Sequence, residues 1–303
     1  MRTALTLKDI STLCTRKQSC RSTAVPTMIK ICSNKNRAVA AALVATVVSL
    51  SAIQAIRAND TAKQIAPIVA KIQHADYAGD QAAMQKGYDD LKPFLEDNEL
   101  VSRIRYWRGF AQWRRAINGF NDSVDPKELE QHLNTALDEF KIAMDKDPTF
   151  LDAKVGTLSC LGYLAFMKRK DQARAKELVG QIMLLLKEAT DMAPDNPRLI
   201  WVRGPILWST PPERGGGQDK AIENYQRGLE VCSKIKKSDD PLEPSWGKLE
   251  LMMSLAYSFA NKRMPDFEAA ERNARAALEI VSYWHYVRDI LLPQILAARA
   301  KAE

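Results

Sequence analysis

Residues 136–148, ALDEFKIAMDKDP, give the clearest indication of the fold. Ala136, Phe140 and Ala143 are spaced by four and three positions, which places them on one helix face, and Pro148 follows five positions later, where it would end the helix. Small residues let two helices approach closely, while an aromatic ring fills the gap to the next helix pair. The stretch therefore predicts the second helix of a packed helical hairpin.

The same pattern recurs along the chain. AIENYQRGL repeats it with Ala221, Tyr225 and Gly228, while AERNARAALE and KEATDMAP keep only its small or proline positions. Matching first helices carry bulky and small residues at fixed positions: Trp107, Phe110 and Ala111; Leu158, Leu161 and Gly162; Ile200 and Gly204; Met252, Leu255 and Ala256. From these residues the chain resembles tetratricopeptide-repeat proteins over about residues 100–280.

The resemblance implies an all-α right-handed superhelix of antiparallel helix pairs. Residues 61–95 look like one more hairpin, and residues 283–300, which contain Pro293, look like a kinked capping helix. We therefore expect about five hairpins plus a C-terminal capping helix, and no sustained period-two pattern from residue 59 onward argues for strands. Two insertions, residues 118–128 and 168–174, depart from the repeat pattern, as does Arg203 at a position that favours an apolar side chain.

The chain divides by charge into a basic leader, residues 1–58, and a repeat domain, residues 59–303. Residues 1–37 carry eight Lys or Arg against one acid, which accounts for the net charge of +7, whereas residues 59–303 carry 35 bases and 36 acids. Because the body is neutral, we expect no nucleic-acid binding.

Residues 38–56 contain no charged residue and indicate a targeting segment. Either a signal peptide cleaved after Ala58 or an uncleaved membrane anchor fits, with translation starting at Met1 or Met28. Export to the periplasm or cell envelope is the expected location, and a mitochondrial presequence is the alternative.

PPERGGGQDKA, residues 211–221, at first suggests a phosphate-binding loop. It lacks a preceding strand, the spacing of such loops and a Ser or Thr after Lys220, so we interpret it as a turn between two helices, with anion binding left open. Its arrangement is similar to a loop in the tetratricopeptide component of TRAP transporters, over residues 204–230 only. His74, His132 and His285 are far apart and pair with no candidate nucleophile, so we expect no catalysis, no metal and no cofactor.

A partner-binding groove is expected along the first helices, because the resemblance implies that certain first-helix positions line a concave surface. These positions are basic or aromatic in this chain: Arg105, Arg108, Gln112, Arg115, Tyr163, Phe166, Arg198, Trp201, Trp208 and Tyr257. Arginine forks bind carboxylates and aromatic rings add contact area. The expected function is a non-catalytic scaffold that binds a protein or acidic peptide; the alternatives are an accessory subunit of a TRAP-type solute transporter, or arginines that stack on neighbouring tryptophans or pair with acids of residues 118–128.

Overall fold

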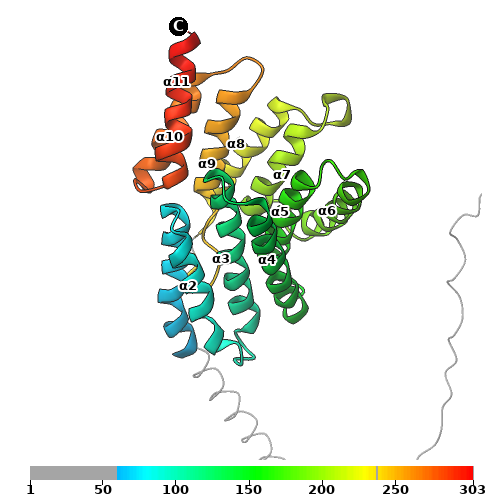
Figure 1. Cartoon of the computed structure of the whole chain (residues 1–303), viewed down its shortest axis with the longest axis vertical. Helices are drawn as coiled ribbons and strands as arrows, with labels where there is room; N and C mark the ends of the chain where they lie inside the picture. The colour runs from blue at the N-terminus through cyan, green and yellow to red at the C-terminus, as the bar shows by residue number, and fades with distance from the viewer. Residues whose placement is uncertain (1–59, 237, 303) are drawn as a thin grey trace, which may run out of the picture. The chain divides into compact units, whose positions relative to one another are not determined.

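The computed structural model describes residues 60–236 and 238–302, and every regular element in them is a helix (Figure 1). The described chain opens in a helix that ends at residue 78. The elements that follow are α2 (Gln81–Asp90), η1 (Lys92–Phe94), α3 (Val101–Asn121), α4 (Pro126–Lys146), α5 (Leu151–Met167), α6 (Gln172–Met192), α7 (Pro197–Ser209), η2 (Pro212–Arg214), α8 (Gln218–Lys234), α9 (Lys248–Asn261), α10 (Phe267–Ile280), η3 (Tyr286–Leu291) and α11 (Leu292–Ala302).

The helices pack as consecutive pairs. The helix of residues 60–78 pairs with α2, and the next four pairs are α3 with α4, α5 with α6, α7 with α8, and α9 with α10. Their first helices also contact one another, α3 with α5, α5 with α7 and α7 with α9, so they form a continuous layer. The expected all-α, tetratricopeptide-like stack of about five hairpins is confirmed.

The aromatic residues of the repeat pattern fill the gaps between helices. Phe140 packs between Gly109 and Gly156, where an added Cβ would lie 2.7 Å and 2.4 Å from its ring. Tyr225 packs in the same way on Gly204, at 2.1 Å from such a Cβ. Gly162 differs, since it is exposed and a Cβ there would meet nothing within 4 Å. The spacing thus indicated close packing correctly at Gly204 but not at Gly162.

The insertion expected between the helices of one hairpin is mostly helix. α3 continues to Asn121 and α4 begins at Pro126, so the connection is residues 122–125. Asp125 caps α4 by accepting from Lys127 N–H, and Pro126 occupies the first turn, where its missing N–H costs nothing. The extra residues therefore lengthen two helices rather than a loop.

The glycine-rich stretch forms the predicted bend between α7 and α8. Gly215 and Gly217 have φ of 82° and 109°, which favour glycine. Gly216 lies so close to the end of α7 that an added Cβ would be 2.3 Å from the Thr210 carbonyl oxygen. Gly217 N–H donates to the Leu207 carbonyl at 2.9 Å, which ties the turn to α7.

The C-terminal segment closes the stack against its start. η3 is a π-helical turn that runs into α11 just before Pro293, and this wider turn accommodates the proline as the expected kink. The preceding residues return to the first hairpin: Tyr283 stacks on His74 with ring centroids 4.5 Å apart, and Trp284 meets Tyr77 edge to face at 5.0 Å. In Figure 1 the turn between α10 and α11 accordingly lies beside one end of the blue first hairpin.

The leader lies outside the described residues, including the segment 38–56 for which a signal or anchor is predicted. Within the described part of the chain, no helix combines the length and apolar character needed to cross a bilayer.

Candidate functional site

One part of the first-helix layer is covered by the chain itself. Residues 240–247, here called the inner segment, are the last part of the connection from α8 to α9; they have no helical structure and lie against α3 and α7. Leu242, Pro244 and Trp246 are buried in alternation with the less buried Glu243 and the exposed Ser245. Residues 240–243 form a turn, in which Glu243 N–H donates to the Asp240 carbonyl at 3.2 Å, and the alternation over residues 244–246 is typical of an extended chain lying with one side on a surface.

Trp246 anchors the inner segment. Its Nε1 donates to the Tyr106 hydroxyl at 2.8 Å, and its ring lies 5.4 Å from Trp113 and 5.7 Å from Trp201, centroid to centroid. One position after Tyr106 on α3, Trp107 Nε1 donates to the Leu242 carbonyl at 2.8 Å. The inner segment is therefore part of the core, and the face that it covers is closed.

A buried ion cluster seals the end of this closed face. Arg114 Nε lies 2.7 Å from Asp76 and its Nη2 lies 3.2 Å from Glu250, and all three side chains are almost fully buried. Tyr77 donates to Glu250 at 3.1 Å, and Gly247 N–H donates to the same carboxylate at 2.8 Å. Burial, with the Glu250 charge adding to it, raises the pKa of Tyr77 well above its usual value. The cluster thus ties the first hairpin to α3, α9 and the inner segment.

A cavity of about 190 Å³ adjoins this cluster and is lined in part by Asp76, Tyr77, Phe110 and Trp246. Its charged groups are already engaged, because Asp76 accepts from Asn118 at 3.0 Å in addition to its ion pair with Arg114. The cluster therefore acts as a structural connection, and Arg114 balances the negative charge of the Asp76 carboxylate beside the cavity.

The four predicted groove residues of α3 lie under α2 and beside α4. Arg105 and Arg108 both pair with Glu139 of α4, at 2.9 Å and 2.8 Å, and Arg108 also donates to the Tyr88 carbonyl at 2.6 Å. Gln112 donates to Gln85 at 3.0 Å, and Arg115 donates to the same Gln85 oxygen. Glu139 belongs to α4 rather than to residues 118–128, so these arginines have acidic partners that the sequence did not single out.

Arg198 and Trp201 of α7 border the inner segment instead. Arg198 forms a two-pronged pair with Asp152, with Nη2 3.0 Å from Oδ2, and donates to the Trp246 carbonyl at 3.3 Å. Trp201 Nε1 donates to Ser254 at 2.9 Å. Ring faces and donors that were expected to bind a partner are here bound by the chain's own residues.

The remaining four predicted residues are half-buried or exposed, with Arg169 over the Phe166 ring at 4.3 Å and Phe120 packed against the Tyr163 ring at 4.9 Å. Tyr163 and Phe166 of α5, Trp208 of α7 and Tyr257 of α9 are here called the aromatic face. The exposed fractions of Phe166 and Tyr257 are 57% and 46%, while Tyr163 and Trp208 are half-buried.

One ring contact and electrostatics connect three residues of this aromatic face, Tyr163, Trp208 and Tyr257. The Trp208 and Tyr257 centroids lie 6.5 Å apart. Burial raises the pKa of Tyr286 to about 12, and the phenols of Tyr163 and Tyr257 both add to that rise. The same two phenols raise the pKa of the buried Tyr225, after burial itself. The phenols of Tyr163 and Tyr257 thus act on the pKa of the same two tyrosines, although they come from α5 and α9.

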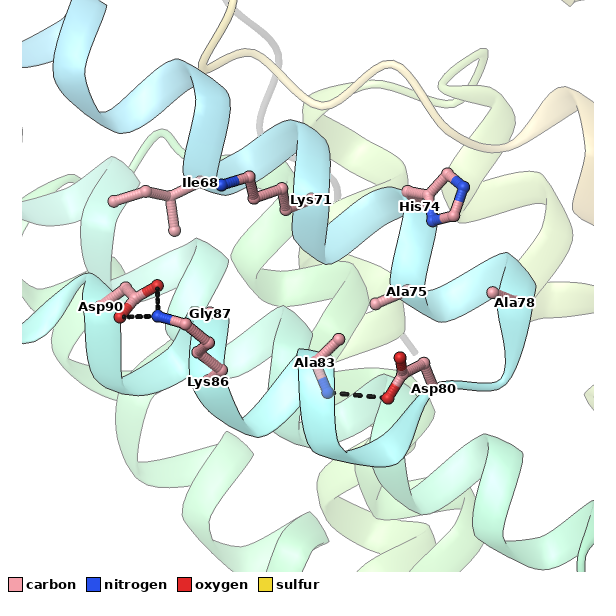
Figure 2. Close-up of a pocket in the computed structure, with 10 residues that line it drawn as sticks. All are labelled: Ile68, Lys71, His74, Ala75, Ala78, Asp80, Ala83, Lys86, Gly87 and Asp90. Atoms are coloured by element: carbon pink, nitrogen blue, oxygen red, sulfur yellow. Dashed lines mark hydrogen bonds and ion pairs between the residues drawn. The ribbon is translucent and has the colours of Figure 1, made fainter.

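A second pocket, of about 210 Å³, lies between the helix of residues 60–78 and α2 (Figure 2). Its floor is apolar, and the close-up shows Lys86 bound to Asp90 and Asp80 accepting from the backbone of Ala83, as a cap of α2. These charged side chains therefore stabilise α2 itself, through an ion pair one turn apart and an N-terminal cap. The glycine-rich turn lines neither this pocket nor the cavity beside Trp246.

Comparisons with known proteins give remote structural similarities alone. No family model matches the chain, and no curated protein matches it. It is similar to the crystal structure of TTC0263, a thermophilic TPR protein of Thermus thermophilus, at 16% identity and a TM-score of 0.49, over 79% of this chain and 99% of that one. It is also similar to yeast Tom70 at 14% identity and a TM-score of 0.31, over 73% of this chain and 53% of that one. At these values neither similarity says what this chain binds.

Sequence reasoning missed the residues that close the inner face. Trp246, Leu242 and Glu250 lie more than 130 positions from their partners on α3. Trp246 had one local signal, since it is a tryptophan in the loop PLEPSWG, where an exposed aromatic residue would be costly.

Proposed function

We propose that this protein is a non-catalytic scaffold that binds a protein partner through the aromatic face. The observation that carries the proposal is the exposure of Phe166 and Tyr257 on a layer whose other aromatic residues are buried or half-buried. Partly exposed Tyr, Trp and Phe side chains on a rigid helical layer supply large contact areas at little entropic cost. Of the arginines expected to select acidic peptides, three are held by Glu139 and Asp152, and Arg115 donates to Gln85, so the aromatic residues rather than these charges would supply the binding energy.

Site-specific photo-crosslinking tests this function. Phe166→p-benzoylphenylalanine would place the crosslinker on the aromatic face, and Leu184→p-benzoylphenylalanine would place it on α6, where the side chain is 71% exposed. We expect adducts from position 166 that are absent from position 184 and that disappear when Tyr257→Ala is added. The same adducts from both positions would refute binding at the aromatic face.

We further propose that residues 1–58 direct export and that the repeat domain, residues 59–303, works in the cell envelope. The support is the basic stretch followed by the uncharged residues 38–56. N-terminal sequencing of the mature protein would give a start at Asn59 if the signal is cleaved, and an intact leader if it is an anchor. A mitochondrial location would show a presequence removed in that organelle.

The TRAP-type accessory subunit stays a prediction of the sequence alone. Genes for a transporter next to this one would favour it, together with a small solute that binds near residues 211–221.

A further inference from the structure

We propose that the aromatic face recognises an extended, proline-containing peptide segment. This inference rests on the proposed function of the same face and specifies its partner. Three observations support it: the chain's own proline-containing inner segment on the same helix layer, the continuity of the two faces, and the unpaired hydrogen-bond donors of the aromatic face.

The inner segment shows how this helix layer binds a non-helical stretch of chain, which is a turn over residues 240–243 followed by residues 244–246 without regular structure. Pro241 and Pro244 flank Leu242, whose carbonyl accepts from the Trp107 indole at 2.8 Å. The Trp246 carbonyl accepts from Arg198 at 3.3 Å. The layer thus binds by donors to backbone carbonyls and by rings against apolar side chains, which are the groups that an extended proline-containing segment presents.

The aromatic face continues this layer. Trp113 donates to Ser159 at 3.1 Å, and Tyr163 lies four residues, or about one helical turn, after Ser159. Trp201 donates to Ser254, and Tyr257 lies three residues after it. Trp208 follows Trp201 by seven residues, or about two turns, on α7. Helices α5, α7 and α9 therefore each carry one residue at the closed face and another, on a similar side of the helix, at the aromatic face.

The donors of the aromatic face have no partner within the described chain. Among residues 60–236 and 238–302, no hydrogen bond is made by the Trp208 indole N–H or by the Tyr163 and Tyr257 hydroxyls. The corresponding indoles of the closed face, Trp107, Trp113, Trp201 and Trp246, all donate. Proline rings pack on aromatic faces, and an extended proline-rich segment leaves its carbonyls free to accept such donors, at a low cost in conformational entropy.

Peptide binding to the full chain tests this inference. Fluorescence anisotropy would compare labelled decaproline with a Gly-Ser decamer and a Glu-Ser decamer of equal length. We expect decaproline to bind most tightly, with an affinity about tenfold weaker for Tyr257→Ala. Trp208→Phe keeps a ring and removes the donor, so it should weaken binding a few-fold, while Leu184→Ala on α6 should leave it unchanged.

The possible results distinguish the preference for proline from binding at the aromatic face as such. If decaproline binds no more tightly than the Gly-Ser decamer, or if Tyr257→Ala and Trp208→Phe both bind it like wild type, the inference is overturned. If the Glu-Ser decamer binds best and Tyr257→Ala weakens it, the proline preference is overturned while binding at the aromatic face stands. Helicity measured by circular dichroism on each variant shows that the fold is kept.

Discussion

The closed and the open parts of the first-helix layer have similar side chains and opposite environments. Trp113 and Trp201 are covered by Trp246, whereas Phe166 and Tyr257 remain about half exposed on the neighbouring helices α5 and α9. The difference is made by one non-helical connection, the inner segment, which covers one part of the layer and leaves the other. An aromatic stripe on repeat helices is therefore buried or exposed according to which segment returns to it.

The ion cluster offers the strongest way to break the closed part. Arg114→Met would leave Asp76 and Glu250 buried side by side without their cation, so we expect the free energy of unfolding to fall by about 3–5 kcal/mol. Urea denaturation measures this. Arg272→Ala, which breaks the exposed pair with Glu268, is the control and should change stability by less than about 1 kcal/mol. Equal losses for the two variants would contradict a structural role for the cluster.

Removing one aromatic side chain from each part compares the two directly. Trp246→Ala would leave a cavity among Trp113, Trp201 and Phe110, and we expect it to lower the free energy of unfolding by about 3–5 kcal/mol. Tyr257→Ala removes a side chain that is 46% exposed and should cost less than about 1 kcal/mol. Thermal unfolding ranks the two, and a larger loss for Tyr257→Ala would reverse the assignment of core and surface.

Two glycines of the repeat pattern, one closely packed and one in open space, extend the comparison to single methyl groups. Gly204→Ala forces a methyl group against the Tyr225 ring, so we expect a loss of about 1–3 kcal/mol. Gly162→Ala adds a methyl group in open space within α5 and should gain about 0.5–1 kcal/mol from helix propensity. Denaturant titrations should show that the free energy of unfolding falls for Gly204→Ala and rises for Gly162→Ala. A fall for both variants would mean that α5 packs at Gly162 as the repeat pattern suggests.

The smallest expected effect concerns the contact that closes the stack. His285 bridges Asp122 of the α3 end and Asp289, each at 2.9 Å, and the hydrogen bond to Asp122, followed by that to Asp289, raises the pKa of His285 above 6.5. The contact therefore stabilises the fold fully below pH of about 6.5 and is lost as the pH rises through the higher folded pKa.

Stability measured against pH tests this contact. The difference between wild type and His285→Gln should be less than about 1 kcal/mol, because the pair is partly exposed, and should shrink as the pH rises. A difference that grows with pH would contradict the assignment.

The fold follows from local spacing, whereas the closed face does not. Ala136, Phe140 and Tyr225 lie within single hairpins, so their spacing predicted helices and packing that the structure confirms. Residues 118–128 were expected to be an insertion because only the repeat length marked them, and they extend α3 and α4 instead.

The candidate site could be predicted only in part, for reasons of distance along the chain. Helical register singled out Tyr163, Phe166, Trp208 and Tyr257, which the structure leaves half-buried or exposed; their role in binding stays a prediction. Arg105 and Arg108 share that register, but α2 and Glu139 cover them. The acid of a different helix and the return of the inner segment leave no periodic signal at the arginines themselves.

Hydroxyl-radical footprinting of the native protein tests the central claim most directly, because it reports the exposure of individual aromatic side chains. We predict rapid modification of Phe166 and Tyr257, slow modification of Trp246 and Trp113, and protection of Phe166 and Tyr257 when decaproline is added. Modification of Trp246 as fast as that of Phe166, or protection confined to the inner segment, would contradict a layer that is closed by its own chain at one part and open to a partner at the other.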